Sequence, residues 1–463
     1  MKNKKKYMMA IGQLGLLALT QVLSGYAYSE DGVSQSEITI GGVMDLEGRS
    51  SGLGLGMKAG IEAALKNQTI SGKKIRFVTL DDSYNPVKTS ASTKALVDQK
   101  VFLFAGNVGT PTAKVSLPIL EHHNIPAIGF FTGAGLLRAN NPNVINYRAS
   151  YVQETKAVIE SALKNGVKPE GICAYVQNDA YGMAGIKGIR KALSNTSASG
   201  SVVATLDQII NMKGDRPKRN GMGPVGVYAR NTFTARAGYD SLKAWEKKQG
   251  TSCRLIVTVG AYASISRFIA YAKSKNEAWV YSAVSFTGAG NLAESLKKFG
   301  VRDKVIMTQV VPLQDSDLAI VKDARRDLGK DYGYVSQEGY IVGKLLLHGL
   351  QQLQQKEKKQ EKVVVSTTGK SKKHGKSSKS GNASDIHKNE VSAARGNKPI
   401  TRDNLMAALR GHKFNLGGLE MDFTDDNQGS DLVVLTTLSK GQWVPLKKTN
   451  WNVLLEQRIA QAN

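Results

Sequence analysis

The feature that most constrains the fold is a regular alternation of short apolar segments with helix-length segments. It begins at residue 37 and predicts strands separated by helices over the first part of the chain. The expected strands are 38–44, 75–80, 101–105 and 126–130, and the expected helices are 54–67, 86–99 and 111–122. Thr110 is a natural N-cap for the third helix, and Pro111 suits its first turn. Alternating strands and helices predict a parallel sheet covered by helices on both faces.

The same alternation restarts near residue 150. The expected helices are 152–164, 184–193, 238–248 and 262–275, and the expected strands are 172–177, 202–209, 255–259, 279–284 and 305–311. The Gly- and Arg-rich passage 212–236 is expected to be mainly loop. Two successive units of similar size predict an α/β protein with two Rossmann-like lobes, and 463 residues are enough for two or three separate cores.

The last part of the chain adds helices and a hairpin. Helices are expected at 318–328, 337–355 and 402–409, with Thr401 as the cap of the last helix and Gly411 as its end. Residues 432–438 and 443–446 are expected to pair as a hairpin with Gly441 in its turn.

The net charge of +25 raises the question of a nucleic-acid partner. Residues 354–398 supply +8 of that charge in a Lys-, Ser- and Gly-rich passage, which predicts a disordered basic insertion. The passage has no aromatic side chains to stack on bases, so we expect no nucleic-acid partner. It could be a solvated loop or an electrostatic tether to anionic polymers or lipid.

The first 27 residues have the three-part layout of a secretory signal peptide. Lysines precede an apolar run at 7–22, and the small-residue exit Gly25-Tyr26-Ala27 follows. We expect cleavage after Ala27 and a soluble protein in the periplasm; an uncleaved membrane anchor is the alternative. In an exported protein Cys173 and Cys253 could form a disulfide or remain two buried thiols.

Ligands of open α/β sheets bind beyond the carboxyl ends of the strands. Residues 106–112 follow an expected strand and enter a helix whose free N–H groups favour an anion such as a carboxylate. Residues 131–135 follow the next strand. In the second unit the strand ends lie at 178–182, 260–262 and 285–288, and they supply tyrosines, hydroxyls and a phenylalanine.

These passages resemble the branched-chain amino-acid-type (leucine/isoleucine/valine-binding-protein-like) substrate-binding proteins of ABC transporters. The resemblance runs from about residue 37 to residue 443, apart from the basic insertion. It rests on the order and spacing of LDDSYNP (80–86), GNVGTPT (106–112), IPAIGFFTGAGLLR (125–138), NYRASY (146–151), QNDAYGMAG (177–185), SFTGAGNLAESL (285–296), TQVVP (308–312) and QEGYIVGKLL (337–346).

The resemblance implies a type I periplasmic-binding fold, in which two lobes are joined by a three-crossover hinge and hold ligand between them. Lobe 1 would comprise 37–149 and 312–430, and lobe 2 would comprise 150–311 and 431–450. It implies a monomer that captures an amino acid or small organic acid and delivers it to a membrane-embedded ABC permease. The implied ligand-binding residues are Thr110, Phe131, Thr132, Gly133, Tyr181, Tyr262, Ser285, Phe286 and Thr287.

Thr110 would bind the ligand carboxylate, together with the main chain of Phe131 and the Gly133 position. Tyr181 and Tyr262 would close over the ligand from lobe 2, and Leu53 falls where the family often has an aromatic residue.

Two positions depart from the family pattern. The glutamate that would hold an α-ammonium falls at Phe286 or Thr287, and Gly133 stands where threonine is expected. A buried ammonium needs a counter-charge, so the sequence favours a small carboxylate or polar molecule without one. Asp179 or Glu338 could restore an amino-acid site, although Glu338 is expected to be structural.

Other classes fit the sequence less well. Gly52, Gly54 and Gly56 imitate a dinucleotide fingerprint, but they lie too far after the strand and lack the full glycine spacing. His122 and His123 have no third metal ligand nearby, and no nucleophile motif is present. We therefore expect a binding protein that is not an enzyme, with no cofactor and no metal. The alternative that stays open is a ligand-binding sensory component acting with a chemoreceptor or sensor kinase.

Overall fold

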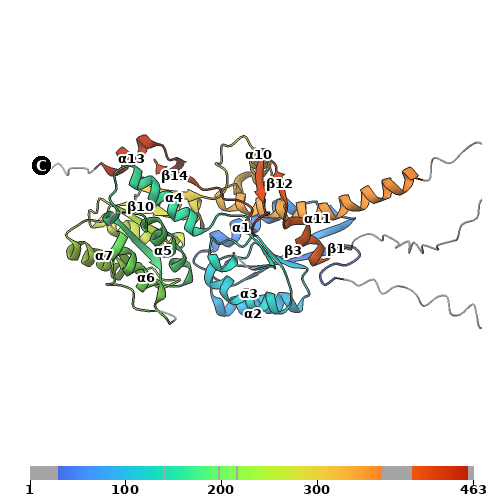
Figure 1. Cartoon of the computed structure of the whole chain (residues 1–463), viewed down its shortest axis with the longest axis horizontal. Coiled ribbons are helices and arrows are strands. Elements are labelled where there is room, and N and C mark those ends of the chain that lie inside the picture. Colours follow the sequence, from blue (N-terminus) through green and yellow to red (C-terminus); the bar gives the residue numbers. More distant parts are fainter. Residues whose placement is uncertain (1–29, 139–140, 197–198, 215–216, 368–398, 457–463) are drawn as a thin grey trace, which may run out of the picture.

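The computed structural model describes residues 30–456 apart from 139–140, 197–198, 215–216 and 368–398, and it has two α/β lobes (Figure 1). Lobe 1 is built on a six-stranded sheet of order β2-β3-β1-β4-β5-β6, parallel except for the β2–β3 pair. Its strands are β1 (Glu37–Met44), β2 (Thr69–Ile70), β3 (Lys73–Asp81), β4 (Leu103–Ala105), β5 (Ala127–Ile128) and β6 (Val144–Ile145).

Helices cover both faces of this sheet. They are α1 (Ser51–Leu65), α2 (Pro86–Asp98), α3 (Thr110–His122), α10 (Ala319–Leu328), α11 (Tyr334–Thr367) and α12 (Arg402–Leu409). Helices α2 and α3 pack together on one face, and α1 packs against α11 on the other (Figure 1). The α1–α11 contact requires glycine, because a Cβ at Gly60 would lie 2.1 Å from the carbonyl oxygen of Ser336. A separate hairpin, β12 (Lys413–Leu416) with β13 (Leu419–Asp422), completes the lobe.

Lobe 2 is built on a seven-stranded sheet of order β15-β14-β11-β10-β9-β7-β8. Its strands are β7 (Ile172–Gln177), β8 (Val225–Tyr228), β9 (Leu255–Val259), β10 (Val280–Ala283), β11 (Val305–Gln309), β14 (Val434–Ser439) and β15 (Gln442–Pro445). Strands β7 to β11 are parallel, and β14 and β15 form the expected antiparallel hairpin, whose turn holds Gly441 at φ 83°. Its helices are α4 (Tyr151–Lys164), α5 (Ala180–Leu193), α6 (Ser199–Asn211), α7 (Arg236–Gln249), α8 (Tyr262–Ser274), α9 (Ala289–Lys298) and α13 (Lys448–Leu455).

The chain passes between the two sheets three times. The first passage joins β6 to α4, the second joins β11 to α10, and the third joins β13 to β14. Short 3-10 turns lie along the chain as η1 (Gly135–Leu137), η2 (Pro169–Gly171), η3 (Ser285–Thr287) and η4 (Gly329–Asp331). Because both lobes are wound from parallel strands, the three passages set the carboxyl ends of the two sheets toward a shared interface.

One sequence-based prediction in lobe 2 is wrong. The expected strand 202–209 is part of helix α6, in which Val202, Leu206 and Ile209 are buried at helical spacing. The β-branched residues favoured a strand, but packing against the lobe 2 core decides the conformation. The described residues of 212–236 are mainly loop, as expected, and they also include the short strand β8 at the edge of the sheet.

Cys173 in β7 and Cys253 just before β9 form a disulfide, which resolves the alternative left open by the sequence. Helix α11 runs to Thr367, beyond residue 354, where the basic insertion was expected to begin. The remainder of that insertion (368–398) and the predicted signal peptide lie outside the described residues. Across the part of the chain that the structure describes, no helix is both long and apolar enough to cross a membrane.

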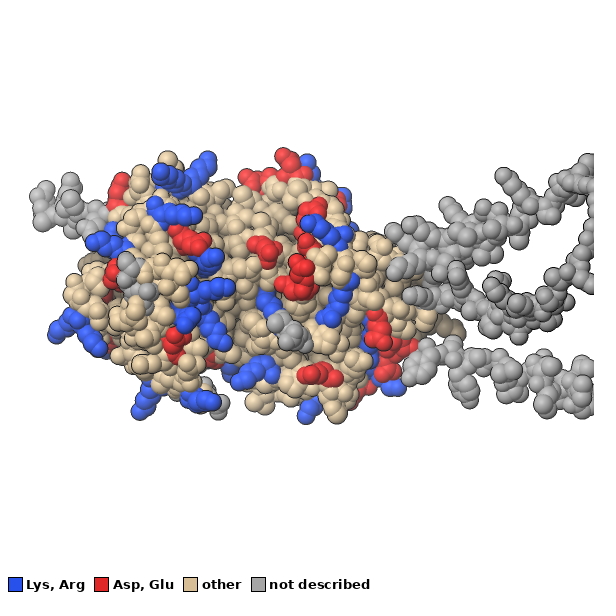
Figure 2. All heavy atoms as spheres, viewed as in Figure 1, with Lys and Arg blue, Asp and Glu red and all other residues tan. Residues whose placement is uncertain are grey.

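Charge is distributed unevenly between the lobes. Residues 150–311 and 431–456 hold 26 Lys and Arg against 13 Asp and Glu. Residues 30–149, 312–353 and 399–430 hold 20 against 21, so lobe 1 is nearly neutral and lobe 2 is basic. Figure 2 shows one face on which Lys and Arg are spread over lobe 2, whereas Asp and Glu gather mostly on lobe 1.

Candidate functional site

The interface between the lobes brings together most of the residues that the sequence singled out. Phe131 follows β5 in lobe 1, and Phe286 lies in the turn after β10 in lobe 2; their ring centroids are 5.1 Å apart. Tyr181, in the first turn of α5, has its ring centroid 4.9 Å from that of Phe286. These contacts are made at the carboxyl ends of the strands in both sheets, where α/β proteins bind ligands.

Thr110 lies in the first turn of α3, and it is not the N-cap that the sequence predicted. The cap position belongs to Gly109, which has φ 104°, a conformation that glycine adopts readily. The Thr110 hydroxyl therefore makes no capping bond and instead contacts the hydroxyl of Thr132 at 2.7 Å. Thr132 in turn donates to the phenolic oxygen of Tyr151 at 3.1 Å. A chain of three hydroxyl groups thus starts beside the N-terminus of a helix, a favourable place for an anion.

Gly133 and the main chain of Phe131 support this arrangement. A Cβ at Gly133 would lie 2.7 Å from the backbone nitrogen of Tyr151, so a side chain there would collide with the start of α4. The Phe131 N–H donates to the carbonyl of Asn107, and its carbonyl accepts from the N–H of Gly109. Both main-chain groups are engaged within lobe 1, and the ring of Phe131 makes the contact with lobe 2.

Five buried rings form an aromatic cluster across the interface, here defined as Tyr84, Phe131, Tyr151, Tyr181 and Phe286. Each is at most 1% exposed. The centroid distance is 6.1 Å for Tyr84–Phe286 and 5.0 Å for Tyr151–Tyr181. Burial raises the pKa of Tyr151 to about 12 and that of Tyr181 well above its ordinary value. The phenol groups therefore stay protonated and can act as hydrogen-bond donors.

Tyr262 and Leu53 lie at one end of this interface, outside the aromatic cluster. The backbone N–H of Gly52 donates to the Tyr262 hydroxyl at 3.4 Å, which joins α1 of lobe 1 to α8 of lobe 2. Leu53 is buried against Gly288 of lobe 2, where an added Cβ would lie only 2.5 Å from the Leu53 side chain. Tyr262 and Leu53 therefore contact the opposite lobe beside the aromatic cluster but are not part of it.

Sequence reasoning missed a network of buried charged residues, which lies beside the aromatic cluster at the first passage between the lobes. Arg148 is fully buried and pairs with Glu154 on α4 at 3.2 Å and with Glu338 on α11 at 3.4 Å. It also donates to the hydroxyl of Ser285, whose backbone N–H donates to Glu154. Ser285, predicted to bind ligand, is thus engaged by this network. Arg148 and Tyr151 fall within NYRASY and Tyr84 within LDDSYNP, so the resemblance contained a signal for them.

Asp179 and Glu338 were the two carboxylates that could have restored a site for an ammonium group, and both have partners in the protein. Asp179 caps α5 by accepting from the N–H of Tyr181, and it pairs with Arg230 at 3.3 Å and accepts from Gln177 at 2.8 Å. Burial raises the pKa of Asp179, although the charge of Arg230 opposes the shift. Burial also raises the pKa of Glu338, to about 7, against the opposing charge of Arg148. Glu338 therefore has a structural role, as the sequence predicted.

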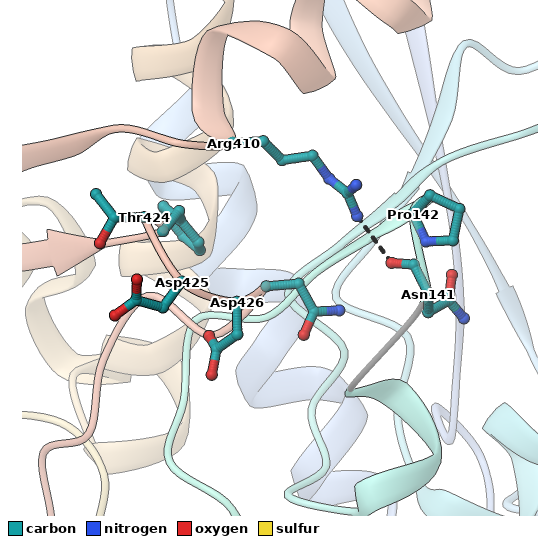
Figure 3. A pocket seen from close by; sticks show the side chains of 8 residues that line it. Asn141, Pro142, Arg410, Thr424, Asp425 and Asp426 are labelled. Carbon is teal, nitrogen blue, oxygen red and sulfur yellow. Dashed lines mark hydrogen bonds between the residues drawn. The ribbon is translucent and has the colours of Figure 1, made fainter.

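Side chains fill the closed interface between the lobes. A residual cavity of about 10 Å³ lies beside Phe131, Ser285 and Glu338. A larger surface hollow of about 690 Å³ lies in lobe 1 (Figure 3). Its lining residues are Asn141, Pro142, Arg410, Phe423, Thr424, Asp425, Asp426 and Asn427. Arg410 spans this hollow and donates to the Asn141 carbonyl at 2.8 Å. The hollow lies just before β6, at the amino end of that strand, so the fold favours the interlobe interface as the ligand site.

None of the His, Cys, Asp and Glu side chains in the described part of the chain form a group of three or more that could hold a metal ion. His122 and His123 contact each other edge to face, with ring centroids 4.9 Å apart at the end of α3.

Comparisons with known proteins agree with this geometry. Residues 37–211 match the family described as periplasmic binding protein. The structure is similar to that of a possible leucine/isoleucine/valine-binding protein from Rhodopirellula baltica, with 28% identity, a TM-score of 0.71, and coverage of 93% of this chain and 100% of the other. No curated protein matches. The fold is the type I periplasmic-binding fold, and the resemblance to binding proteins of the branched-chain amino-acid type is confirmed.

Two more distant structures share the fold. One is a branched-chain amino acid ABC transporter protein from Thermus thermophilus with bound valine, at 15% identity, a TM-score of 0.63, and coverage of 90% of this chain and 96% of the other. The other is a fatty acid ABC transporter substrate-binding protein from Thermomonospora curvata, at 14% identity, a TM-score of 0.65, and coverage of 91% and 94%. The fold therefore occurs with different ligands and does not itself identify the ligand.

Proposed function

We propose that this protein is an exported solute-binding protein that captures a small carboxylate or amino acid between its lobes and delivers it to an ABC permease. The observation that carries the proposal is a chain of hydroxyl groups that crosses the closed interface, from Thr110 and Thr132 of lobe 1 to Tyr151 of lobe 2. The ring of Tyr151 lies beside that of Tyr181, which in turn contacts Phe286. The protein would work in the periplasm, where it would bind and release its ligand without a chemical reaction.

In this proposal the ligand first binds to lobe 1, and lobe 2 then closes over it. The ligand carboxylate accepts hydrogen bonds from the hydroxyls of Thr110 and Thr132 and from N–H groups at the start of α3. Tyr181, Phe286 and Thr287 then cover the ligand from lobe 2. Closure of the lobes about the three connecting passages would present the loaded form to the permease.

A thermal-shift screen of residues 28–463 against amino acids and small organic acids tests the proposal. A ligand at 100 times its dissociation constant adds about 2.7 kcal/mol to the free energy of unfolding, which gives a clear rise in Tm. Thr110→Val removes a hydroxyl that would bind a charged group, and we expect affinity to fall roughly 10- to 100-fold.

Thr93→Val is the matched control. The Thr93 hydroxyl is buried in α2 and has no hydrogen-bond partner in the described part of the chain, and its removal should leave affinity unchanged. The proposal would be contradicted if ligands that raise Tm bound equally well to wild type and to Thr110→Val. It would also be contradicted if no acid or amino acid in the panel raised Tm.

A further inference from the structure

Three carboxylates beside the aromatic cluster, those of Glu154, Glu338 and Asp179, are paired with arginine within the protein. Glu154 pairs with Arg148 through one oxygen and accepts from Ser285 and Thr308 through the other. Glu338 pairs with the same arginine, and Asp179 pairs with Arg230 and accepts two further hydrogen bonds. An ammonium group would have to break one of these pairs to use any of the three carboxylates as its counter-charge. Taking an uncompensated charge out of water is costly, so the interface disfavours a ligand that carries one.

Phe286 gives the cluster its shape. Its ring contacts rings on three sides, with centroid distances of 5.1 Å to Phe131, 6.1 Å to Tyr84 and 4.9 Å to Tyr181. Phe131 and Phe286 come from opposite lobes and are inclined by only 30°. When the lobes separate, these two rings part, and a flat ring between them would contact an aromatic face on each side. Contacts between aromatic rings contribute free energy beyond the apolar area that they bury, so such a position favours an aromatic over an aliphatic group.

Two hydroxyl groups of lobe 2 beside the rings have no hydrogen-bond partner among the residues that the structure describes. The Tyr181 hydroxyl and the Thr287 hydroxyl are buried without a hydrogen bond, and both side chains have 0% exposure. An unsatisfied buried hydroxyl costs stability, so such groups in a native protein call for an explanation. Both come from lobe 2, opposite Thr110 and Thr132. A ligand with polar groups at both ends of a flat apolar body would satisfy the two lobes together.

We infer that the ligand is a monocarboxylic acid with a flat aromatic ring and without an α-ammonium group, held with its ring between Phe131 and Phe286. Its carboxylate faces Thr110 and Thr132, and an oxygen substituent at the far end of the ring reaches Tyr181 and Thr287. This inference rests on the proposed function, because it assigns a ligand class to the same interlobe site.

Calorimetry on the intact protein with paired ligands tests the inference. 3-Phenylpropionate and L-phenylalanine share a skeleton and differ in the ammonium group, as do 4-methylpentanoate and L-leucine. We expect 3-phenylpropionate to bind at least 100-fold more tightly than L-phenylalanine and at least several-fold more tightly than 4-methylpentanoate. 3-(4-Hydroxyphenyl)propionate should bind more tightly again, because it offers a hydroxyl to Tyr181 and Thr287.

Phe286→Leu keeps an apolar side chain but removes the stacking ring. We expect the affinity for 3-phenylpropionate to fall about 3- to 10-fold, with the affinity for 4-methylpentanoate little changed. Phe299→Leu is the control, because Phe299 is 45% exposed at the end of α9 in the same lobe and should not affect either acid.

The outcomes separate this inference from the proposed function. Tighter binding of L-leucine or L-phenylalanine than of its ammonium-free partner would overturn the inference and leave a solute-binding protein for amino acids. Tighter binding of the aliphatic acid would overturn the aromatic preference. Binding of none of these compounds would also overturn the inference, and the wider acid and amino-acid screen with Thr110→Val would then decide the proposed function by itself.

Discussion

Arg148 shows how one side chain can join the lobes at the residue scale. It lies on the first passage between them, is 0% exposed, and pairs with Glu154 of lobe 2 and Glu338 of lobe 1. Its charge keeps both carboxylates compensated and holds Ser285 in place beside the aromatic cluster. Buried ion pairs of this kind contribute little net stability as a whole, but losing one partner is costly because the other charge stays buried.

Arg148→Gln should lower the free energy of unfolding by about 3–5 kcal/mol, because Glu154 and Glu338 would lose their cation inside the protein. Urea denaturation followed by circular dichroism measures the change. Arg190→Gln is the control: Arg190 also pairs with an acid, Asp207 at 2.9 Å, but on the exposed surface of lobe 2, and we expect no measurable effect. Equal stability of the two variants would show that the buried network does not hold the lobes.

At the scale of elements, the loop between β3 and α2 depends on a buried carboxyl group. Asp82 is 0% exposed and accepts from the N–H of Tyr84 and the hydroxyl of Thr89, each at 2.8 Å. Burial raises its pKa to about 7, with a smaller contribution from Asp45 and Asp81. Because Tyr84 belongs to the aromatic cluster, the same loop sets one wall of the candidate site.

The raised pKa of Asp82 predicts a pH dependence with a definite sign. Its ordinary value is 3.8, so the folded protein binds the proton more tightly than the unfolded chain does. This group therefore favours folding most below about pH 4, and its contribution falls as pH rises to about 7. The loss is at most about 4 kcal/mol. Asp82→Asn should reduce the fall in Tm between pH 4 and pH 7, and an unchanged slope would contradict the assignment.

The sequence predicted these elements well where local rules and tertiary packing agree. The hairpin around Gly441 and the cap at Thr401 are confirmed, because turn and capping preferences act locally. Helix α6 was mistaken for a strand because Val202 and Ile209 favour extended structure, while burial against lobe 2 favours a helix. The Arg148 network could not be derived from spacing, since Glu154 and Glu338 come together only when both lobes are formed.

At the scale of the whole molecule, contacts on several sides of the aromatic cluster hold the lobes together. Arg49 of lobe 1 lies over the ring of Phe233 of lobe 2, with its guanidinium carbon 4.4 Å from the centroid. The amide of Asn231 donates to the carbonyl of Ser83 at 3.3 Å, and Gln177 donates to the Tyr84 hydroxyl at 3.2 Å. A ligand between the lobes would add to these contacts and favour the closed form over an open one.

The basic character of lobe 2 fits an anionic ligand at this scale. Its excess of Lys and Arg over Asp and Glu should raise the local concentration of small anions and speed their association, with an effect that weakens as salt is added. Lobe 1 is nearly neutral and supplies the hydroxyls of Thr110 and Thr132. Attraction by one lobe and hydrogen bonding by the other would together favour a carboxylate.

The measurement that tests the central claim most directly is hydrogen–deuterium exchange with and without the best-binding acid of the panel. The account predicts slower exchange on both sides of the interface at once, in residues 106–112 and 131–135 of lobe 1 and in residues 178–186 and 285–292 of lobe 2. Residues 423–427, which line the hollow at Arg410, should be unaffected. Protection confined to one lobe, or centred on residues 423–427, would contradict capture between the lobes.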